Sequence, residues 1–291
     1  MKRGVVNYFK LIKFSHTVFA MPFAFIGFFL GIQSFPNEVV LETTRLFLLV
    51  IGCMVFARSA AMAFNRYLDR YFDALNPRTA QREIPVGVIA PQQALWFIVA
   101  MSVLFVSCAW MINLLCFFLS PLALLIILGY SYTKRFTPFC HIVLGAGLSL
   151  APIGAYLAVT SQFALVPLLF SFAVLTWVSG FDIIYALQDE AFDKKQQLKS
   201  IPVWLGIKSA LNVSRVLHTI SFILIGLAGW YGPFGALYWV GTVIYGSLLI
   251  YQQWLVKPDD LSRVNLAFMT VNGIASIVFA IFVISDLYFV V

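Results

Sequence analysis

Residues 93–132 read QALWFIVAMSVLFVSCAWMINLLCFFLSPLALLIILGYSY, forty residues without one charged side chain. A membrane-spanning helix needs about 20 apolar residues, so this stretch is long enough for two spans, which we divide at Asn113. The rest of the chain has the same character. Of its 291 residues, 62% are hydrophobic and 11% are charged, whereas soluble domains carry roughly 25% charged residues. The sequence therefore predicts an all-α, polytopic membrane protein.

Windows of apolar sequence near the spanning length predict about nine transmembrane helices. The predicted spans are residues 14–33, 43–64, 93–112, 114–132, 139–159, 164–187, 208–230, 233–252 and 264–285. A continuous helix through Asn113 would reduce the count to eight. The first span is long enough to cross the membrane and no A-x-A-like cleavage site follows it, so we expect it to be retained rather than removed as a signal peptide. We treat residues 1–291 as one transmembrane domain.

The basic residues indicate the orientation of the chain and explain its net charge of +7. With the N-terminus in the cytoplasm, the cytoplasmic segments carry 16 of the 19 Lys and Arg residues. These segments are 1–13, 66–92, 133–138, 188–208 and 253–263. This is the positive-inside pattern of membrane proteins. The positive charge therefore suits an anionic lipid surface, and no nucleic-acid partner is expected. The four cysteines form no CxxC pair and are expected to be small apolar residues.

Acidic residues are concentrated at the cytoplasmic ends of two predicted helices. The chain has 12 Asp and Glu residues, and seven of them lie after the second span or around the end of the sixth. These seven are Asp69, Asp73, Glu83, Asp182, Asp189, Glu190 and Asp193. Random surface decoration would have spread them over all the helix ends. We therefore interpret this concentration as a functional site.

The two clusters share the same spacing. Asn65, Asp69 and Asp73 lie four residues apart, which places them on one helical face. Asp189 and Asp193 repeat the spacing 120 residues later. Like charges four residues apart repel, and a carboxylate at bilayer depth costs roughly 3 kcal/mol, so a cation between the two faces would offset both terms. Oxygen ligands suit Mg²⁺, which takes one or two carboxylates together with substrate phosphate oxygens.

A purely structural interpretation treats these aspartates as solvated helix ends that pair with their neighbours in sequence. The neighbouring basic residues are Arg66, Arg70, Lys194 and Lys195. This interpretation explains one cluster as well as metal binding does. It does not explain two matched clusters on helices of the same polarity, so we favour a Mg²⁺ site shared by both.

The sequence resembles the UbiA superfamily of membrane prenyltransferases. That family carries N-x-x-x-D-x-x-x-D after its second helix and D-x-x-x-D after its sixth. The matching residues here are Asn65, Asp69, Asp73, Asp189 and Asp193. The stretches NPRTAQREIP at 76–85, YTKR at 132–135 and KSIP at 199–202 also look like the family, and the resemblance covers essentially the whole chain. One departure is Arg66, where many members place an aspartate, and we assign it no ligand role.

The resemblance implies a ring of helices around a central cavity that cytoplasmic loops cap. It also implies which residues of the cavity bind the metal and the diphosphate. The residues implied to hold Mg²⁺ against the diphosphate of a polyprenyl diphosphate are Asn65, Asp69, Asp73, Asp189 and Asp193. Arg78, Lys134 and Lys199 would bind the outer phosphate oxygens, since cations beside metal-bound phosphate stabilise a leaving group. Arg82 and Arg135 receive less weight because basic loop residues usually set topology. Aromatic side chains would shield the allylic cation from water until an electron-rich ring attacks it.

Arg58 and Asp182 are the candidates for the acceptor end of this site. Arg58 lies seven residues before Asn65, on the same helical face and deeper in the membrane, where an arginine indicates function by default. It would bind an acceptor carboxylate, form an internal ion pair with Asp182, or do both. Asp182 would orient the acceptor hydroxyl or receive its proton, with a structural role as the alternative. Lys13 and His16 are secondary candidates at the cytoplasmic end of the first span.

The resemblance favours an aromatic acid as acceptor. The stretches KFSHTVFAMP at 13–22 and DIIYALQD at 182–189 look most like the 4-hydroxybenzoate branch, and a dihydroxynaphthoate of menaquinone biosynthesis is the main alternative. Haem O and chlorophyll synthases share the fold but act on tetrapyrroles. A transporter would need helices broken near the midplane, for which Pro121 and Pro152 are the candidates. Because no organellar transit peptide precedes the first span, we expect a bacterial inner membrane protein whose site faces the cytoplasm.

Overall fold

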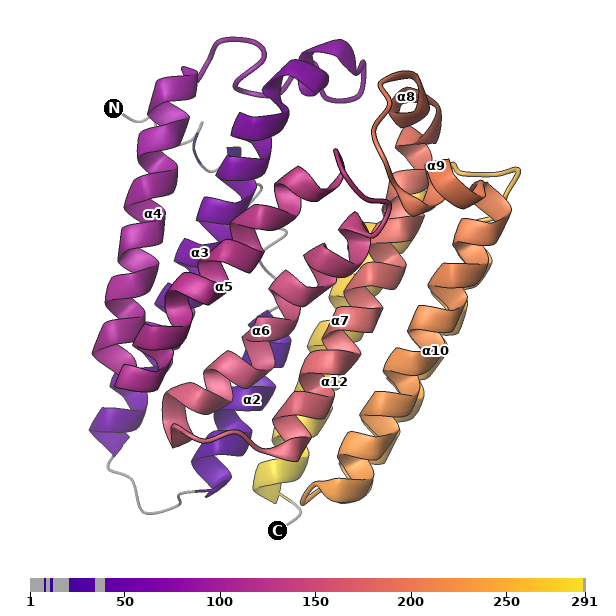
Figure 1. Ribbon diagram of the computed structural model, residues 1–291. Helices are drawn as coiled ribbons and strands as arrows, with labels where there is room; N and C mark the ends of the chain where they lie inside the picture. The colour runs from indigo at the N-terminus through magenta and orange to yellow at the C-terminus, as the bar shows by residue number, and fades with distance from the viewer. Residues whose placement is uncertain (1–7, 9–10, 13–20, 35–39, 290–291) are drawn as a thin grey trace.

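The computed structural model describes residues 8, 11–12, 21–34 and 40–289, and within these residues the chain folds into helices without a β-strand. The elements are α2 (Met21–Ser34), α3 (Val40–Leu75), α4 (Pro91–Ile112), α5 (Leu114–Thr133), α6 (Cys140–Thr160), α7 (Leu165–Ala186), the 3₁₀ turn η2 (Leu187–Asp189), α8 (Glu190–Lys195), α9 (Ile201–Leu205), α10 (Ile207–Tyr231), α11 (Ala236–Leu255), the π-helix η3 (Leu266–Val271) and α12 (Asn272–Phe289). The long helices lie side by side along the length of the bundle (Figure 1). Helices suit a bilayer because each satisfies its own backbone hydrogen bonds.

The helix boundaries agree with most of the predicted spans. Asn113 separates α4 from α5, so the continuous helix through Asn113 that the alternative assumed is wrong. Its side chain accepts a hydrogen bond from the backbone N–H of Cys116 at 2.8 Å and donates to the carbonyl of Leu157 at 2.9 Å. Seven helices of the described chain are long and apolar enough to cross a membrane, and α2 is a shorter apolar helix of 14 residues. Since α11 is not among the seven, a count of nine spans stays a prediction.

The helices that carry the two acidic clusters end differently from each other. The second predicted span ends at residue 64, but α3 continues to Leu75 and keeps Asn65, Asp69 and Asp73 on one unbroken helix. In contrast, α7 ends at Ala186 and the chain tightens into η2 before α8 begins. Asp189 therefore closes a 3₁₀ turn, and Asp193 lies on the short helix that follows.

Close helix contacts through small residues define the packing around α7, which lies against α6 and α10. At Gly145 on α6, an added Cβ atom would lie 2.4 Å from the carbonyl oxygen of Leu175 on α7. At Gly27 on α2, it would lie 2.0 Å from the carbonyl oxygen of Pro152 on α6. Small residues allow this backbone approach between membrane helices. Pro121 and Pro152 both lie inside continuous helices, so neither breaks its helix as the transporter interpretation requires.

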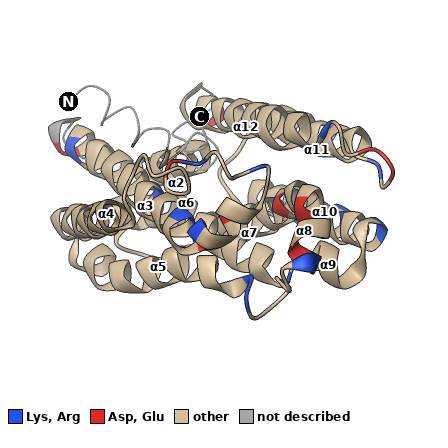
Figure 2. Ribbon diagram, turned by 90° about the horizontal axis from the view of Figure 1, so that it is seen from above, with Lys and Arg blue, Asp and Glu red and all other residues tan. Residues whose placement is uncertain are grey.

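The loops that carry the charged residues gather at one end of the bundle. Figure 1 places the segment after α3, the α5–α6 connection, α8 and α9 at the same end. A view onto this end shows Lys, Arg, Asp and Glu residues on the loops and helix ends (Figure 2). This arrangement agrees with the predicted parity of the helices. It brings the end of α3 close to the end of α7, where the candidate site lies.

Candidate active site

A polar cavity of about 250 Å³ opens at the charged end of the bundle, between α3, α5, α6, α7 and α8. The predicted site residues that line it are Arg58, Asn65, Asp69, Asp73, Arg78, Lys134, Asp182, Asp189 and Asp193. Both acidic clusters therefore converge on one space, although they lie about 120 residues apart in sequence.

The aspartates of α3 are paired with basic residues from two different loops. Asp69 Oδ1 accepts a hydrogen bond from Arg135 Nη2 at 3.0 Å, and Asn65 Nδ2 donates to Asp69 Oδ2 at 3.1 Å. Asp73 is only 6% exposed, and Arg82 Nη1 donates to both of its oxygens at 2.8 and 2.9 Å. Charge-assisted hydrogen bonds of this kind hold buried carboxylates in place.

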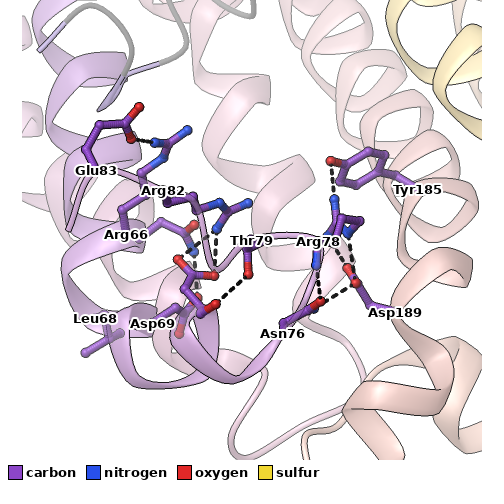
Figure 3. A network of polar contacts seen from close by, with 12 residues as sticks. Arg66, Leu68, Asp69, Asn76, Arg78, Thr79, Arg82, Glu83, Tyr185 and Asp189 are labelled. Carbon is purple, nitrogen blue, oxygen red and sulfur yellow. Dashed lines mark hydrogen bonds and ion pairs between the residues drawn. The ribbon is translucent and has the colours of Figure 1, made fainter. Parts of the chain in front are cut away.

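Arg78 connects the segment after α3 to the end of α7 (Figure 3). Its Nε donates to Asp189 Oδ1 at 3.0 Å, and its Nη2 donates to Asp189 Oδ2, which makes a bidentate pair. Its Nη1 donates to the hydroxyl of Tyr185 at 2.7 Å, and Asn76 Nδ2 donates to Asp189 Oδ1 at 3.1 Å. Burial alone would lower the pKa of Arg78, but the hydrogen bonds to Asp189 raise it above its ordinary value. Arg78 is therefore a permanent cation in the cavity.

Lys134 and Asp193 form the fourth ion pair, at 2.7 Å between Nζ and Oδ2. Asp193 is 1% exposed, whereas 33% of the Lys134 side chain remains exposed. Burial would lower the pKa of Lys134, but the Asp193 carboxylate raises it above its usual value. In the cavity Asp69, Asp73, Asp189 and Asp193 thus each face a basic side chain of their own.

The interpretation of the aspartates as solvated helix ends is wrong. Arg66 is buried and pairs with Glu83, so it neutralises a residue of the loop instead of an aspartate. Arg70 donates to the carbonyl of Tyr67 at 2.6 Å. Lys194 and Lys195 are exposed. None of these four neighbours in sequence therefore forms a salt bridge with an aspartate of the two motifs, because residues that are adjacent in a helix lie on different faces.

Lys199 is the predicted diphosphate ligand that the structure does not bring to the cavity. Its side chain is exposed, and Nζ donates to the carbonyl of Phe136 at 3.0 Å. Arg82 and Arg135 line the cavity instead, although sequence alone favoured them less. Two features of the sequence could have indicated that both arginines line the cavity. Arg135 directly follows Lys134, and Arg82 follows the acidic motif of residues 65–73.

The acceptor end contains Arg58, Tyr130, His141 and Asp182. The predicted ion pair between Arg58 and Asp182 is wrong: Asp182 Oδ2 lies 2.7 Å from His141 Nδ1 instead. Arg58 makes no salt bridge to any described residue, and its buried Nε has no hydrogen-bond partner there. Sequence reasoning missed His141 because one histidine near the start of an apolar helix carries no periodic signal. Lys13 and His16 lie outside the described residues.

An apolar cavity of about 390 Å³ adjoins the polar one, between α3, α4, α5 and α6. The two cavities share Arg58, Tyr130, Leu144 and Leu148 in their linings. Apart from Arg58, the apolar cavity is lined almost wholly by uncharged and mostly aliphatic side chains. An arginine therefore lies at the junction between a charged space and a space suited to hydrocarbon.

The polar cavity has the donor set that Mg²⁺ requires. Carboxylate and amide oxygens are the ligands that this hard ion prefers, and Asp193 Oδ2 is buried without a well-directed hydrogen bond, although Lys134 Nζ lies 2.7 Å away. Within the described residues, no three acidic, His or Cys side chains are arranged around one point, because each carboxylate faces a basic residue. The residues fit the ion in the chemistry of their donor atoms.

Comparison with known proteins agrees with this fold. Residues 20–274 match the UbiA prenyltransferase family, and the chain belongs to that family. It is an integral, multi-pass membrane protein. The 4-hydroxybenzoate octaprenyltransferase of Tolumonas auensis is 31% identical over 234 residues, which cover 80% of this chain and 82% of that protein. The 4-hydroxybenzoate octaprenyltransferase of Aliivibrio fischeri is 30% identical over 264 residues, which cover 89% of this chain and 88% of that protein.

Solved structures show the same helical arrangement. A UbiA homolog from Aeropyrum pernix superposes with a TM-score of 0.83 at 32% identity, covering 93% of this chain and 98% of that one. A UbiA homolog from Archaeoglobus fulgidus, solved bound to GPP and Mg²⁺, superposes with a TM-score of 0.76 at 24% identity. The superposition covers 97% of this chain and 99% of that one.

Proposed function

We propose that this protein transfers a polyprenyl group from polyprenyl diphosphate to an aromatic acid, and that the acid is 4-hydroxybenzoate. The observation that carries the proposal is the convergence of both acidic clusters and four basic side chains on one cavity that adjoins an apolar space. The names of the relatives support the choice of acceptor. On this proposal the whole chain forms one catalytic domain, and the product enters quinone biosynthesis.

The polar cavity is suited to a metal diphosphate. The residues proposed to hold Mg²⁺ are Asn65, Asp69, Asp73, Asp189 and Asp193. When bound, Mg²⁺ would neutralise charge on the diphosphate and stabilise pyrophosphate as a leaving group. Arg78 and Lys134 then become free to donate charge-assisted hydrogen bonds to the phosphate oxygens, and Arg82 and Arg135 are placed to do the same.

The apolar cavity supports the choice of a polyprenyl donor. A hydrocarbon chain is stabilised by about 25 cal/mol for each Å² of apolar surface that it removes from water. Because the two cavities share Arg58 and Tyr130, a chain whose diphosphate lies in the polar cavity can enter the apolar one directly. Exclusion of water from this route would also protect an allylic cation from hydrolysis.

Arg58 supports an acceptor that is an anion. Its guanidinium lines both cavities and makes no salt bridge to a described residue. An arginine binds a carboxylate through two parallel hydrogen bonds, so an aromatic carboxylate would complete the pairing that the protein leaves open. The positive-inside distribution further supports a site that faces the cytoplasm, in a bacterial inner membrane.

The test is a reconstituted assay with purified protein, Mg²⁺, a polyprenyl diphosphate and a panel of aromatic acids that includes 4-hydroxybenzoate and dihydroxynaphthoates. We expect prenylated 4-hydroxybenzoate together with pyrophosphate release, and loss of both when EDTA removes the metal. Asp69→Asn and Asp189→Asn should abolish turnover, whereas Lys195→Ala on the exposed face of α8 should not. If product forms only with a dihydroxynaphthoate, that acid replaces 4-hydroxybenzoate as the acceptor. If pyrophosphate is released with none of the acids, the proposed enzymatic activity is refuted.

A further inference from the structure

The close crossing of α6 and α7 brings one histidine against one aspartate at the acceptor end. Gly145 permits the approach, because its added Cβ would lie 2.4 Å from both the Leu175 carbonyl oxygen and Ser179 Oγ. Ser179 Oγ donates to the His141 carbonyl at 3.1 Å, which ties the first turn of α6 to α7. His141 lies one helical turn before Gly145, and Asp182 lies three residues after Ser179, so both side chains emerge beside this contact.

The contact between His141 and Asp182 is short, and the aspartate side chain stays partly exposed. His141 Nδ1 lies 2.7 Å from Asp182 Oδ2, with 3% of the histidine side chain and 22% of the aspartate side chain exposed. His141 Nε2 is buried without a hydrogen-bond partner among the described residues. A histidine kept only for packing would normally have both ring nitrogens satisfied, because an unpaired buried polar atom costs about 1–3 kcal/mol.

Among the titratable groups around Asp182, His141 is the one that contacts its carboxylate and can orient it. The other titratable groups that line this end are Arg58 from α3, Tyr130 from α5 and Cys140 from α6. None of them forms a hydrogen bond or ion pair with Asp182. Asp182 Oδ1 accepts no hydrogen bond from the described residues, so one oxygen is held by His141 while the other remains available in the cavity.

We propose that His141 is a positioning residue that holds Asp182 so that its free oxygen receives the proton lost by the acceptor. This inference rests on the proposed prenyl transfer. In that reaction the allylic C–O bond breaks and its electron pair leaves with pyrophosphate, while a ring carbon of the acceptor forms the new C–C bond. The ring C–H bond then breaks, its electrons restore aromaticity, and the proton passes to the Asp182 carboxylate.

The contact through Nδ1 predicts which substitutions of His141 will be tolerated. The amide nitrogen of asparagine occupies the place of Nδ1 and can still donate to Asp182, whereas the amide nitrogen of glutamine occupies the place of Nε2. We expect His141→Gln and His141→Leu to lower kcat/KM for the acceptor by about 10²-fold, the lower end of the range for lost proton-transfer catalysis. His141→Asn should stay within about tenfold of the wild type. The donor KM should change less than about twofold in all three variants.

A double-mutant cycle tests whether His141 acts through Asp182. Asp182→Ala should lower acceptor kcat/KM as far as the double variant with His141→Leu does, because residues that act as one unit are not additive. Equal losses in His141→Asn and His141→Gln, additive losses in the cycle, or a matching rise in donor KM would each overturn the inference. Thermal unfolding of the three histidine variants shows which of them are folded. If His141→Leu does not fold, the comparison of His141→Asn with His141→Gln decides whether His141 positions Asp182. A wild-type protein that releases no pyrophosphate with any acid would instead refute the proposed function itself.

Discussion

The Lys134–Asp193 pair allows a quantitative test of how the charged cavity is held together. Asp193 is 1% exposed and depends on Lys134 Nζ at 2.7 Å, whereas 33% of the Lys134 side chain is exposed. In Lys134→Met the carboxylate would remain buried without its cation. Removal of one partner from a buried pair costs about 3–5 kcal/mol. We expect about 3 kcal/mol of lost unfolding free energy, since water in the cavity reaches the position of Lys134.

The reciprocal substitution should cost less, because the two partners differ in exposure. In Asp193→Asn the partly exposed ammonium of Lys134 can turn toward water, and the amide oxygen remains an acceptor, so we expect a loss of about 1 kcal/mol. The double variant replaces the ion pair by two neutral groups. Such replacements are often close to neutral, so its loss should be about 1–2 kcal/mol, below the sum of the single losses.

The assay is chemical unfolding of the four proteins in detergent micelles, followed by tryptophan fluorescence. Lys195→Met is the matched control, because Lys195 is exposed at the end of α8 and a surface change of this kind usually stays within about 0.5 kcal/mol. If Lys134→Met costs no more than Asp193→Asn, or if the two losses add, the pair is not coupled in the way that its burial indicates.

Two further measurements address the apolar cavity and the crossing of α6 with α7. Cys53 and Cys116 line the apolar cavity and Cys108 does not, so a long-chain prenyl diphosphate should slow labelling of single-cysteine variants by an apolar maleimide at the first two positions only. Equal protection at all three would show that the chain does not occupy this cavity. Gly145→Ala should lower acceptor kcat/KM at least tenfold, because its methyl would lie 2.4 Å from a backbone oxygen of α7. Gly226→Ala on α10, whose added Cβ meets nothing within 4 Å and which lines neither cavity, should have no effect on that constant.

The sequence predicted the helices well where the bilayer alone determines them. A run of about 20 apolar residues can be recognised without knowledge of its partners, and Asn113 marked a true boundary. The predicted span ended at residue 64, because the hydropathy signal ends there, and only the four-residue spacing of Asn65, Asp69 and Asp73 indicated that the helix continues beyond it. Their helical form follows from continuation of a helix that is already formed, which needs no new nucleus.

The site was predictable where spacing within one helix defined it, and not where distant segments meet. The three residues Asn65, Asp69 and Asp73 could be placed on one face from their period. Their basic partners could not, since Arg135 lies 66 residues from Asp69 and reaches it only through the packing of α5. The pairing of His141 with Asp182 depends in the same way on a close helix crossing, which hydropathy does not reveal.

The charges in the cavity differ in one respect that bears on selectivity. Asp69, Asp73, Asp189 and Asp193 each have a basic partner, whereas Arg58, at the junction of the two cavities, makes no salt bridge to a described residue. An unpaired arginine at membrane depth costs roughly 3 kcal/mol, and a ligand carboxylate would recover part of that cost. A neutral phenol of similar shape would recover none of it. On the proposed function, preference for an acid therefore follows from the charge of Arg58, which no described residue pairs.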